Sequence, residues 1–278
     1  MSSATSIVYV YGVLTNCTNL ALDMPPGDLA GLVESGPLRM LPFGNIAALV
    51  CDFVLPDGSD LETILEDSRS AERLILNHHQ VLVDMVGRHT ILPLRFGAVF
   101  TEDAGVIAAL GDRFSVLQNA LGRIDGALEW GVKTFCDRKL LRQHVAGAVS
   151  EISSLESEIA DQGEGKAFFL RRRIERLILE EVEKTLEQCV AGTQEQLKPS
   201  VIEETLVKLQ PPTLHGHEHD MISNRSYLIA RGTEDAFMQS LENLRVAYAP
   251  LGLDYQMNGP WPAYSFSDQQ LGGGVNDQ

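Results

Sequence analysis

The sequence is short of basic side chains. Its 278 residues include 22 lysines and arginines against 38 aspartates and glutamates, which gives a formal net charge of −16 at neutral pH. Nucleic-acid backbones are bound mainly through clustered Lys and Arg, and an acidic protein field opposes that attraction. The charge balance therefore argues against nucleic acid as a partner.

Cysteine is scarce as well. The four cysteines stand at positions 17, 51, 136 and 189, and no two of them form a C-x-x-C pair. Zinc ribbons and disulfide scaffolds need cysteines at close or regular spacing. The scattered thiols argue against both and suit a reducing cytoplasm.

Long hydrophobic runs are missing. No apolar run reaches the length of about 18 residues that spans a bilayer, so no membrane partner is expected. The opening stretch MSSATSIVYVYGV carries no basic residue ahead of its apolar run, which indicates a first strand and not a signal peptide. A chain of this length and 44% hydrophobic content is long enough for two domains.

Recognisable catalytic motifs are also missing. The sequence contains no Walker loop, Rossmann glycine fingerprint, H-E-x-x-H motif or nucleophile elbow. No motif therefore states an activity, and no cofactor is expected.

The stretch from Asp67 to Phe100 is the centre of the predicted first domain. Apolar side chains at helical spacing predict an amphipathic helix that ends near Gly87. The apolar run Ile91 to Phe96 predicts a buried strand directly after it. With the strand at Ile7 to Tyr11, these elements indicate a mixed α/β domain over residues 1–126.

Two residues interrupt the apolar pattern of this stretch. His78 lies on the buried face of the predicted helix, where a core histidine that donates to a carbonyl is favoured over a catalytic one. Arg95 stands between two apolar residues of the predicted strand, where a charge needs a partner. An ion pair between strand and helix is the favoured interpretation, and a partner-binding arginine is the alternative.

From position 127 the pattern indicates a second domain. Trp130 to Cys136 alternates as a strand, and two apolar seams, Leu141 to Ile159 and Leu170 to Cys189, predict an antiparallel helical hairpin. A capped helix is expected between Pro199 and Pro211, followed by a weak strand near 213–214.

Three elements complete the prediction: a strand at 221–230, a helix from Thr233 and a strand at 253–257. The fold class is therefore α+β, with a modified ferredoxin-like domain over 127–266 that carries a long helical hairpin. The glycine-rich end, residues 267–278, has the composition of a disordered tail.

Two polar clusters remain. His215, His217 and His219 alternate along an extended segment and could offer imidazoles to Zn²⁺ or Ni²⁺, but they follow two prolines in a loop, so a metal-binding enzyme or sensor is only the alternative function. Arg171 and Arg172 belong to a basic run that precedes several glutamates. A solvated face with ion pairs at helical spacing is favoured there over a docking patch.

Four segments carry a resemblance to a known family: YVYGV at 9–13, HHQVLVDMVGRHTILPLRFG at 78–97, GKAFFLRRR at 165–173 and GPWPAYSF at 259–266. Together they resemble the GvpF/GvpL family of gas vesicle proteins. The last is the most specific, because Trp261 stands between two prolines after a glycine.

The resemblance implies a non-enzymatic accessory protein of gas vesicle formation, located at the gas vesicle in the cytoplasm. Family members are associated with the main wall protein GvpA, which they are thought to keep from aggregating, or they join the vesicle as a minor component. A structural component that lines the gas-facing side is a further alternative. Under this hypothesis Arg95, Arg171, Arg172 and Trp261 are the candidate partner-binding residues.

Shielding of this kind needs an apolar groove or an open strand edge, because a very apolar wall subunit must be covered until it is incorporated. Strand edges are expected at the strand with Pro93 and at the last strand, which ends at Pro260, because proline is tolerated there.

Overall fold

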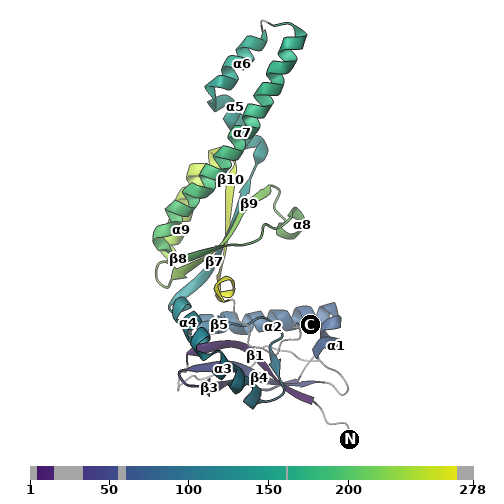
Figure 1. The fold of residues 1–278 in the computed structure, drawn as a ribbon, viewed down its shortest axis with the longest axis vertical. Coiled ribbons are helices and arrows are strands. Elements are labelled where there is room, and N and C mark those ends of the chain that lie inside the picture. Colours follow the sequence, from purple (N-terminus) through teal and green to yellow (C-terminus); the bar gives the residue numbers. More distant parts are fainter. Residues whose placement is uncertain (1–4, 16–33, 56–60, 161, 268–278) are drawn as a thin grey trace. The chain divides into compact units, whose positions relative to one another are not determined.

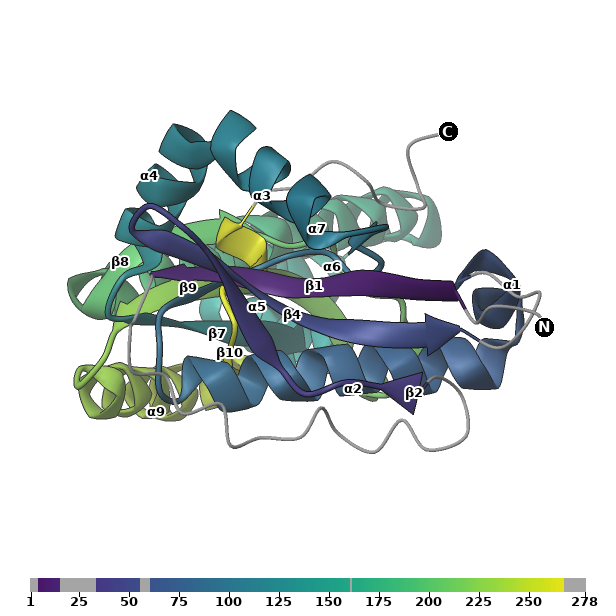
Figure 2. The same cartoon turned by 90° about the horizontal axis from the view of Figure 1, so that it is seen from below.

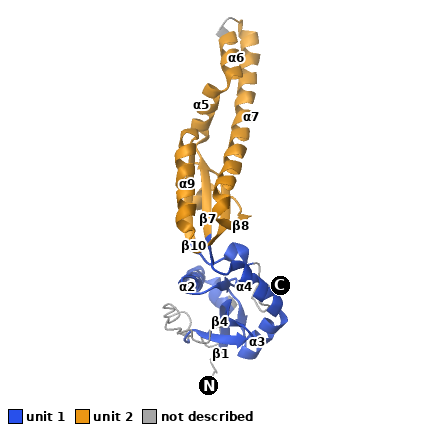
Figure 3. Cartoon of the chain, turned by 90° about the vertical axis from the view of Figure 1, so that its left-hand side faces the viewer, with its two compact units in different colours: residues 1–129, 260–278 blue, residues 130–259 orange. Residues whose placement is uncertain are grey.

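The computed structural model describes residues 5–15, 34–55, 61–160 and 162–267. The chain divides into two compact units (Figures 1 and 3). Unit 1 comprises residues 1–129 and 260–278, and unit 2 comprises residues 130–259. The expected second domain, 127–266, differs from unit 2 because the chain returns to unit 1 after Gly259. Residues 268–278, most of the expected tail, lie outside the described residues.

Unit 1 is built on a six-stranded sheet in which β1 and β4 pair antiparallel over most of their length. Its strands are β1 (Thr5–Thr15), β2 (Glu34–Ser35), β3 (Arg39–Phe43), β4 (Ile46–Leu55), β5 (Ile91–Pro93) and β6 (Val99–Phe100). Both faces of β1 are buried from Val8 to Leu14, as its β-branched and aromatic sequence predicts.

Four helices cover this sheet: α1 (Leu61–Glu66), α2 (Ser68–Val86), α3 (Asp103–Asp112) and α4 (Phe114–Ile124). Figure 2 shows α2 on one side of β1 and β4, and α3 and α4 on the other. The side chain of Asp67 accepts a hydrogen bond from the Ser70 N–H and caps α2. The buried face of α2 includes Leu74, His78 and Leu82, so the predicted amphipathic helix is confirmed.

The strand expected at 91–96 is shorter than predicted. β5 ends at Pro93, and Arg95 is exposed on the loop that follows, so the expectation of a buried charge was wrong. Proline has no N–H with which to continue the ladder, although the N–H of Leu94 still donates to the carbonyl of Tyr11 at 3.1 Å. β5 lies at one end of the strand path, which confirms the predicted edge at Pro93.

Unit 2 contains a four-stranded sheet in the order β10-β7-β9-β8. Its strands are β7 (Ala127–Cys136), β8 (Val201–Leu206), β9 (Asp220–Ala230) and β10 (Leu253–Trp261). Read in chain order this is the fourth, first, third and second strand, the order of a ferredoxin-like sheet, and the fold prediction is confirmed. β10 is an edge strand, as its Pro260 predicts.

The segment from 199 to 215 corrects one prediction. β8 occupies 201–206, where a capped helix was expected, and 212–215 form the short helix α8 (Pro212–His215), where the missing strand was expected. β8 is rich in β-branched residues, and it pairs antiparallel with β9 from Val201 to Leu206. Pairing between distant strands therefore overrides the local capping pattern.

The helical hairpin extends the first crossover of unit 2 (Figure 1). It consists of α5 (Arg138–Ala148), α6 (Ser150–Ala160) and α7 (Glu164–Leu197). The first arm is two helices and not one, because Val149 adopts an extended conformation between them. Leu141, Val145 and Ile152 share a buried core with side chains of α7 such as Ile178, and with the last helix, α9 (Glu234–Tyr248). No helix among the described residues has the length and apolar character needed to cross a membrane.

Gly12 lies where β1 pairs with β5, opposite Pro93. A Cβ atom at this position would lie 2.7 Å from the carbonyl oxygen of Leu92 and 2.9 Å from a side-chain carbon of Ile91. We expect Gly12→Ala to lower the free energy of unfolding of unit 1 by about 1 to 3 kcal/mol, because backbone atoms must move to admit the methyl group. Urea unfolding followed by Trp261 fluorescence in a Trp130→Phe background measures this change.

Gly122→Ala is the matched control. Gly122 lies in α4 of the same unit, and a Cβ atom there would meet no atom within 4 Å. This variant should gain about 0.5 to 1 kcal/mol, since alanine favours the helix. Equal effects at both positions would show that the contact of Gly12 with β5 is not a constraint on the fold.

Candidate functional site

Three of the segments that carry the family resemblance come together in unit 1. Tyr9 lies on β1, His78 on α2 and Leu94 after β5, and these residues are joined by hydrogen bonds. The third segment approaches from the end of the chain: the hydroxyl of Tyr264 lies 3.2 Å from Nδ1 of His79, and the ring of Trp261 lies 5.2 Å from the His79 ring. The candidate site therefore lies around the loop after β5, from Leu94 to Gly97, which these residues support.

A buried hydrogen-bond chain holds that loop in place. Nε2 of His78 lies 3.2 Å from the carbonyl oxygen of Leu94, which can only accept, so Nε2 carries the proton. Nδ1 then accepts from the hydroxyl of Tyr9 at 2.8 Å, and the Tyr9 oxygen accepts from the N–H of Gly97 at 3.4 Å. Gly97 has a φ of 96°, a conformation that favours glycine. His78 is the core histidine that the sequence predicts.

Burial keeps the imidazole of His78 neutral. The side chain is almost fully enclosed, and the loss of water lowers its pKa to about 4. The hydrogen bond to the Leu94 carbonyl raises the pKa, but by less than burial lowers it. Its ring stacks on Tyr11 at a centroid distance of 5.5 Å. Both ring nitrogens are used in holding strand, helix and loop together, so the residue has a structural and not a catalytic role.

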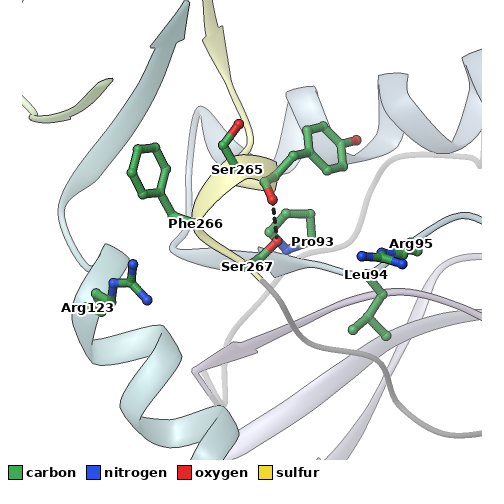
Figure 4. Close-up of a pocket in the computed structure, with 8 residues that line it drawn as sticks. Pro93, Leu94, Arg95, Arg123, Ser265, Phe266 and Ser267 are labelled. Atoms are coloured by element: carbon green, nitrogen blue, oxygen red, sulfur yellow. Dashed lines mark hydrogen bonds between the residues drawn. The ribbon is translucent and has the colours of Figure 1, made fainter. Parts of the chain in front are cut away.

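A pocket of about 460 Å³ opens beside this loop (Figure 4). Its lining residues come from the loop, from α4 and from the end of the chain: Pro93, Leu94, Arg95, Arg123, Tyr264, Ser265, Phe266 and Ser267. Figure 4 shows Arg123 and Arg95 on opposite sides of the segment with Phe266 and Ser267. We call this the arginine pocket.

The buried carboxylate of Glu129 fixes the wall of the arginine pocket. It accepts from the N–H of Ser265 at 2.8 Å and from the Ser265 hydroxyl at 2.6 Å. Burial, together with the charge of Glu129, raises the pKa of Tyr264, so its phenol stays protonated. The hydrogen bonds to Glu129 thereby fix the short helix at Tyr264–Phe266 to the first residues of β7.

The chemistry of the arginine pocket is that of anion recognition. Arg95 and Arg123 are both exposed, and a guanidinium group offers paired N–H donors that match a carboxylate. Tyr264 beside them is held in its neutral form, and the Glu129 carboxylate in the wall is occupied by the N–H and the hydroxyl of Ser265. The pocket is therefore suited to bind an acidic group of a partner. Arg123 was not predictable from the sequence, because only the fold brings α4 beside the loop.

The structure does not bring Arg171 and Arg172 to this pocket. Both are exposed on α7 in unit 2, and the guanidinium carbon of Arg172 lies 5.4 Å from the ring centre of Phe168. Farther along the helix, Arg176 and Glu180 form an ion pair at helical spacing with a distance of 3.8 Å, whereas Glu175 pairs with Arg142 of α5 at 2.7 Å. Of the first two arginines of the run, Arg172 lies beside the exposed ring of Phe168.

The histidine loop packs on the sheet of unit 2. The ring of His217 stacks on the buried Phe135 at 3.9 Å, and its Nε2 lies 3.2 Å from a carboxylate oxygen of Asp254. Nδ1 of His215 accepts from the N–H of His217, and Nδ1 of His217 accepts from the N–H of His219. Within the described residues no group of three or more His, Cys, Asp or Glu is arranged to hold a metal ion. The alternative of a metal enzyme or sensor has no support.

His78 gives unit 1 a specific pH dependence. Its pKa is about 6.5 in the unfolded chain and about 4 in the fold, so the unfolded state binds a proton first as the pH falls. The free energy of unfolding should drop between pH 7 and pH 4 by up to about 3 kcal/mol from this residue. Gln at this position keeps a donor and an acceptor but does not titrate, so His78→Gln should flatten the pH profile of urea unfolding. The exposed His144, changed to Gln, is the control, and an unchanged profile in both variants would contradict the assignment.

The stacking role of His217 is tested by two substitutions. His217→Ala uncovers Phe135 and should lower the free energy of unfolding of unit 2 by about 1 to 2 kcal/mol. His217→Phe keeps an aromatic ring there and should recover most of the loss. Thermal unfolding with and without added Zn²⁺ measures both effects. A zinc-dependent rise in Tm that the wild type shows and His217→Ala lacks would revive the metal site.

The comparisons with known proteins agree with this architecture. The family described as "Gas vesicle synthesis protein GvpL/GvpF" matches residues 7–268. The chain is 28% identical to gas vesicle protein F of Streptomyces sp. (strain CB03234), over 93% of this chain and 98% of that one. It is 25% identical to gas vesicle protein L of the same organism, over 95% and 94%.

Solved structures show the same fold. The crystal structure of the gas vesicle protein GvpF from Anabaena sp. PCC7120 superposes with a TM-score of 0.70 at 22% identity, over 95% of this chain and 99% of that one. The GvpF structure from Microcystis aeruginosa gives a TM-score of 0.60 at 20% identity, with the same coverage. On the length of the family match and these relatives, the chain belongs to the GvpL/GvpF family of gas vesicle synthesis proteins.

Proposed function

We propose that this protein assists gas vesicle assembly by binding the main wall protein GvpA and keeping it from aggregating before it joins the wall. The observation that carries the proposal is the family match, which runs over residues 7–268 and supports an accessory role in gas vesicle formation. The protein acts as a binding partner and not as an enzyme, and its place of action is the gas vesicle.

The surface of the described residues suits this role. Several large apolar side chains are more than half exposed, including Phe168, Phe169, Leu206, Leu214 and Val246. Exposed apolar groups of this size can cover the apolar surface of a partner. The net charge of −16 keeps the resulting complex dispersed, because like-charged particles repel one another.

The arginine pocket supplies the polar part of recognition. Arg95 and Arg123 place two positive groups in the lining of one pocket, and this pair of charges favours a carboxylate of the partner. Trp261 packs beside His79, so its part is to hold the segment that forms the pocket wall. The exposed Arg171 and Arg172, of which Arg172 lies beside Phe168, provide a second basic and aromatic surface in unit 2.

Co-expression with GvpA tests the proposed function. With this protein present, the fraction of GvpA that sediments from the lysate should fall several-fold, because apolar surface is covered before wall subunits meet. The measurement is quantitative blotting of the supernatant and the pellet. Equal sedimentation with and without the protein would contradict the role.

Arg95→Ala and Arg123→Ala test the arginine pocket separately. Each substitution removes one cation from an exposed wall, so each should weaken GvpA retention in a pull-down by about threefold to tenfold, and the Tm of each variant is measured beside it to separate lost binding from lost stability. The control is Arg69→Ala, since Arg69 is exposed at the start of α2 and lies outside the pocket. Retention that falls equally in all three variants would assign the effect to total charge.

A further inference from the structure

Strand β8 leaves one side of its backbone open. It is the last strand in the order β10-β7-β9-β8, and within the described residues it pairs with β9 alone. The N–H of Val207 donates to the carbonyl of Asn224 at 2.9 Å, which places the groups of Val207 on the side of β9. Backbone groups alternate in direction along a strand. Those of Glu204 and Leu206 therefore point away from the sheet.

The open side of β8 is lined by apolar groups. The side chains of Ile202 and Leu206 are 53% and 69% exposed. A groove of about 410 Å³ runs between β8 and the C-terminal end of α7, where Ala191 and Gln194 face Val201 and Ile202. A strand added here would gain main-chain hydrogen bonds from the edge and apolar contacts from the groove.

The edge lacks two devices that commonly protect a sheet. Proline and lysine blunt edge strands, because one removes a donor and the other keeps a charge at the edge. β10, at the other edge of the same sheet, carries Pro260, whereas the sequence VIEETL of β8 contains neither residue. β8 is therefore the edge of this sheet that is open to pairing.

Charge decides what kind of strand fits. The three antiparallel registers that overlap at least five residues of β8 with β8 of a second copy place Glu203 opposite Glu203, Glu203 opposite Glu204, or Glu204 opposite Glu204. Like charges directly opposite each other destabilise a strand pair, while opposite charges stabilise it. In the groove, Glu195 on α7 pairs with Lys198 at 3.5 Å, so the charge argument depends on Glu203 and Glu204 of the strand itself. The edge thus disfavours a second copy and favours a strand that carries Lys or Arg.

We infer that the free edge of β8 binds an extended segment of a partner, in which apolar residues alternate with at least one basic residue, as a fifth strand of the sheet. The inference rests on the proposed function in taking GvpA as the protein that supplies this segment. The partner strand packs its apolar side chains against Ile202, Leu206 and the groove beside α7. Its basic side chain lies opposite Glu203 or Glu204.

Leu206→Pro tests the edge in the full chain. The substitution removes an N–H that points away from β9 and leaves the β8–β9 ladder in place, so the fold is retained. GvpA should be retained at least about tenfold less in the pull-down, because a main-chain hydrogen bond is lost and the ring obstructs the added strand. Leu206→Thr keeps the N–H and strand propensity and should lose much less. Val246→Thr, on exposed α9, is the control.

Amide hydrogen exchange supplies a second readout that does not depend on a variant. With GvpA bound, the amides of Glu204 and Leu206 should slow by about tenfold or more, whereas those of Thr205 and Val207, on the side of β9, should change little.

Wild-type protein that fails to retain GvpA would overturn the proposed function and this inference together. Retention that is equal in wild type and Leu206→Pro, with unchanged exchange at Glu204 and Leu206, would overturn the edge inference alone. The protein without GvpA could also form a dimer that the Leu206→Pro substitution dissociates. That result would assign the edge to a second copy and would also overturn the edge inference.

Discussion

The hydrogen bonds between Tyr9, His78 and Leu94 are the constraint on which unit 1 depends. They join a central strand, the longest helix of the unit and the loop after β5, at a place where water does not reach. A buried polar group without its partner costs about 1 to 3 kcal/mol, so each member of the chain fixes the others. The neutral state of His78 follows from the same enclosure. The position of Arg95 at the rim of the arginine pocket depends on this support.

Unit 2 shows which features are predictable from sequence and which are not. The helical hairpin was predictable because apolar periodicity is a local property, and its seam is buried as expected. β8 was not, since Pro199, Ser200 and Glu203 form a good helix start, and only pairing with β9 makes the segment a strand. The break at Val149 was missed for a related reason: the apolar spacing continues through it, although the backbone does not.

The candidate site shows the same limit more sharply. Its two arginines, Arg95 and Arg123, and the wall at 264–267 lie far apart in the sequence, and no spacing rule connects them. Arg95 is exposed because the pairing of β5 ends at Pro93, and the apolar sequence from Ile91 to Phe96 does not show where the pairing ends. In the histidine loop the spacing suggested a metal site, but Phe135 beneath the loop gives His217 an aromatic surface to cover. A metal or catalytic site predicted from residue spacing alone is unreliable where the side chains instead pack on, or hydrogen-bond to, residues that are distant in the sequence.

The two proposed binding surfaces differ in physical character, and that difference is suited to an apolar partner. Strand addition at β8 would draw on main-chain groups and apolar area and favour a basic segment, while the arginine pocket would favour an acidic group. A partner that reaches both surfaces binds more tightly than either permits, because the second contact forms within one complex.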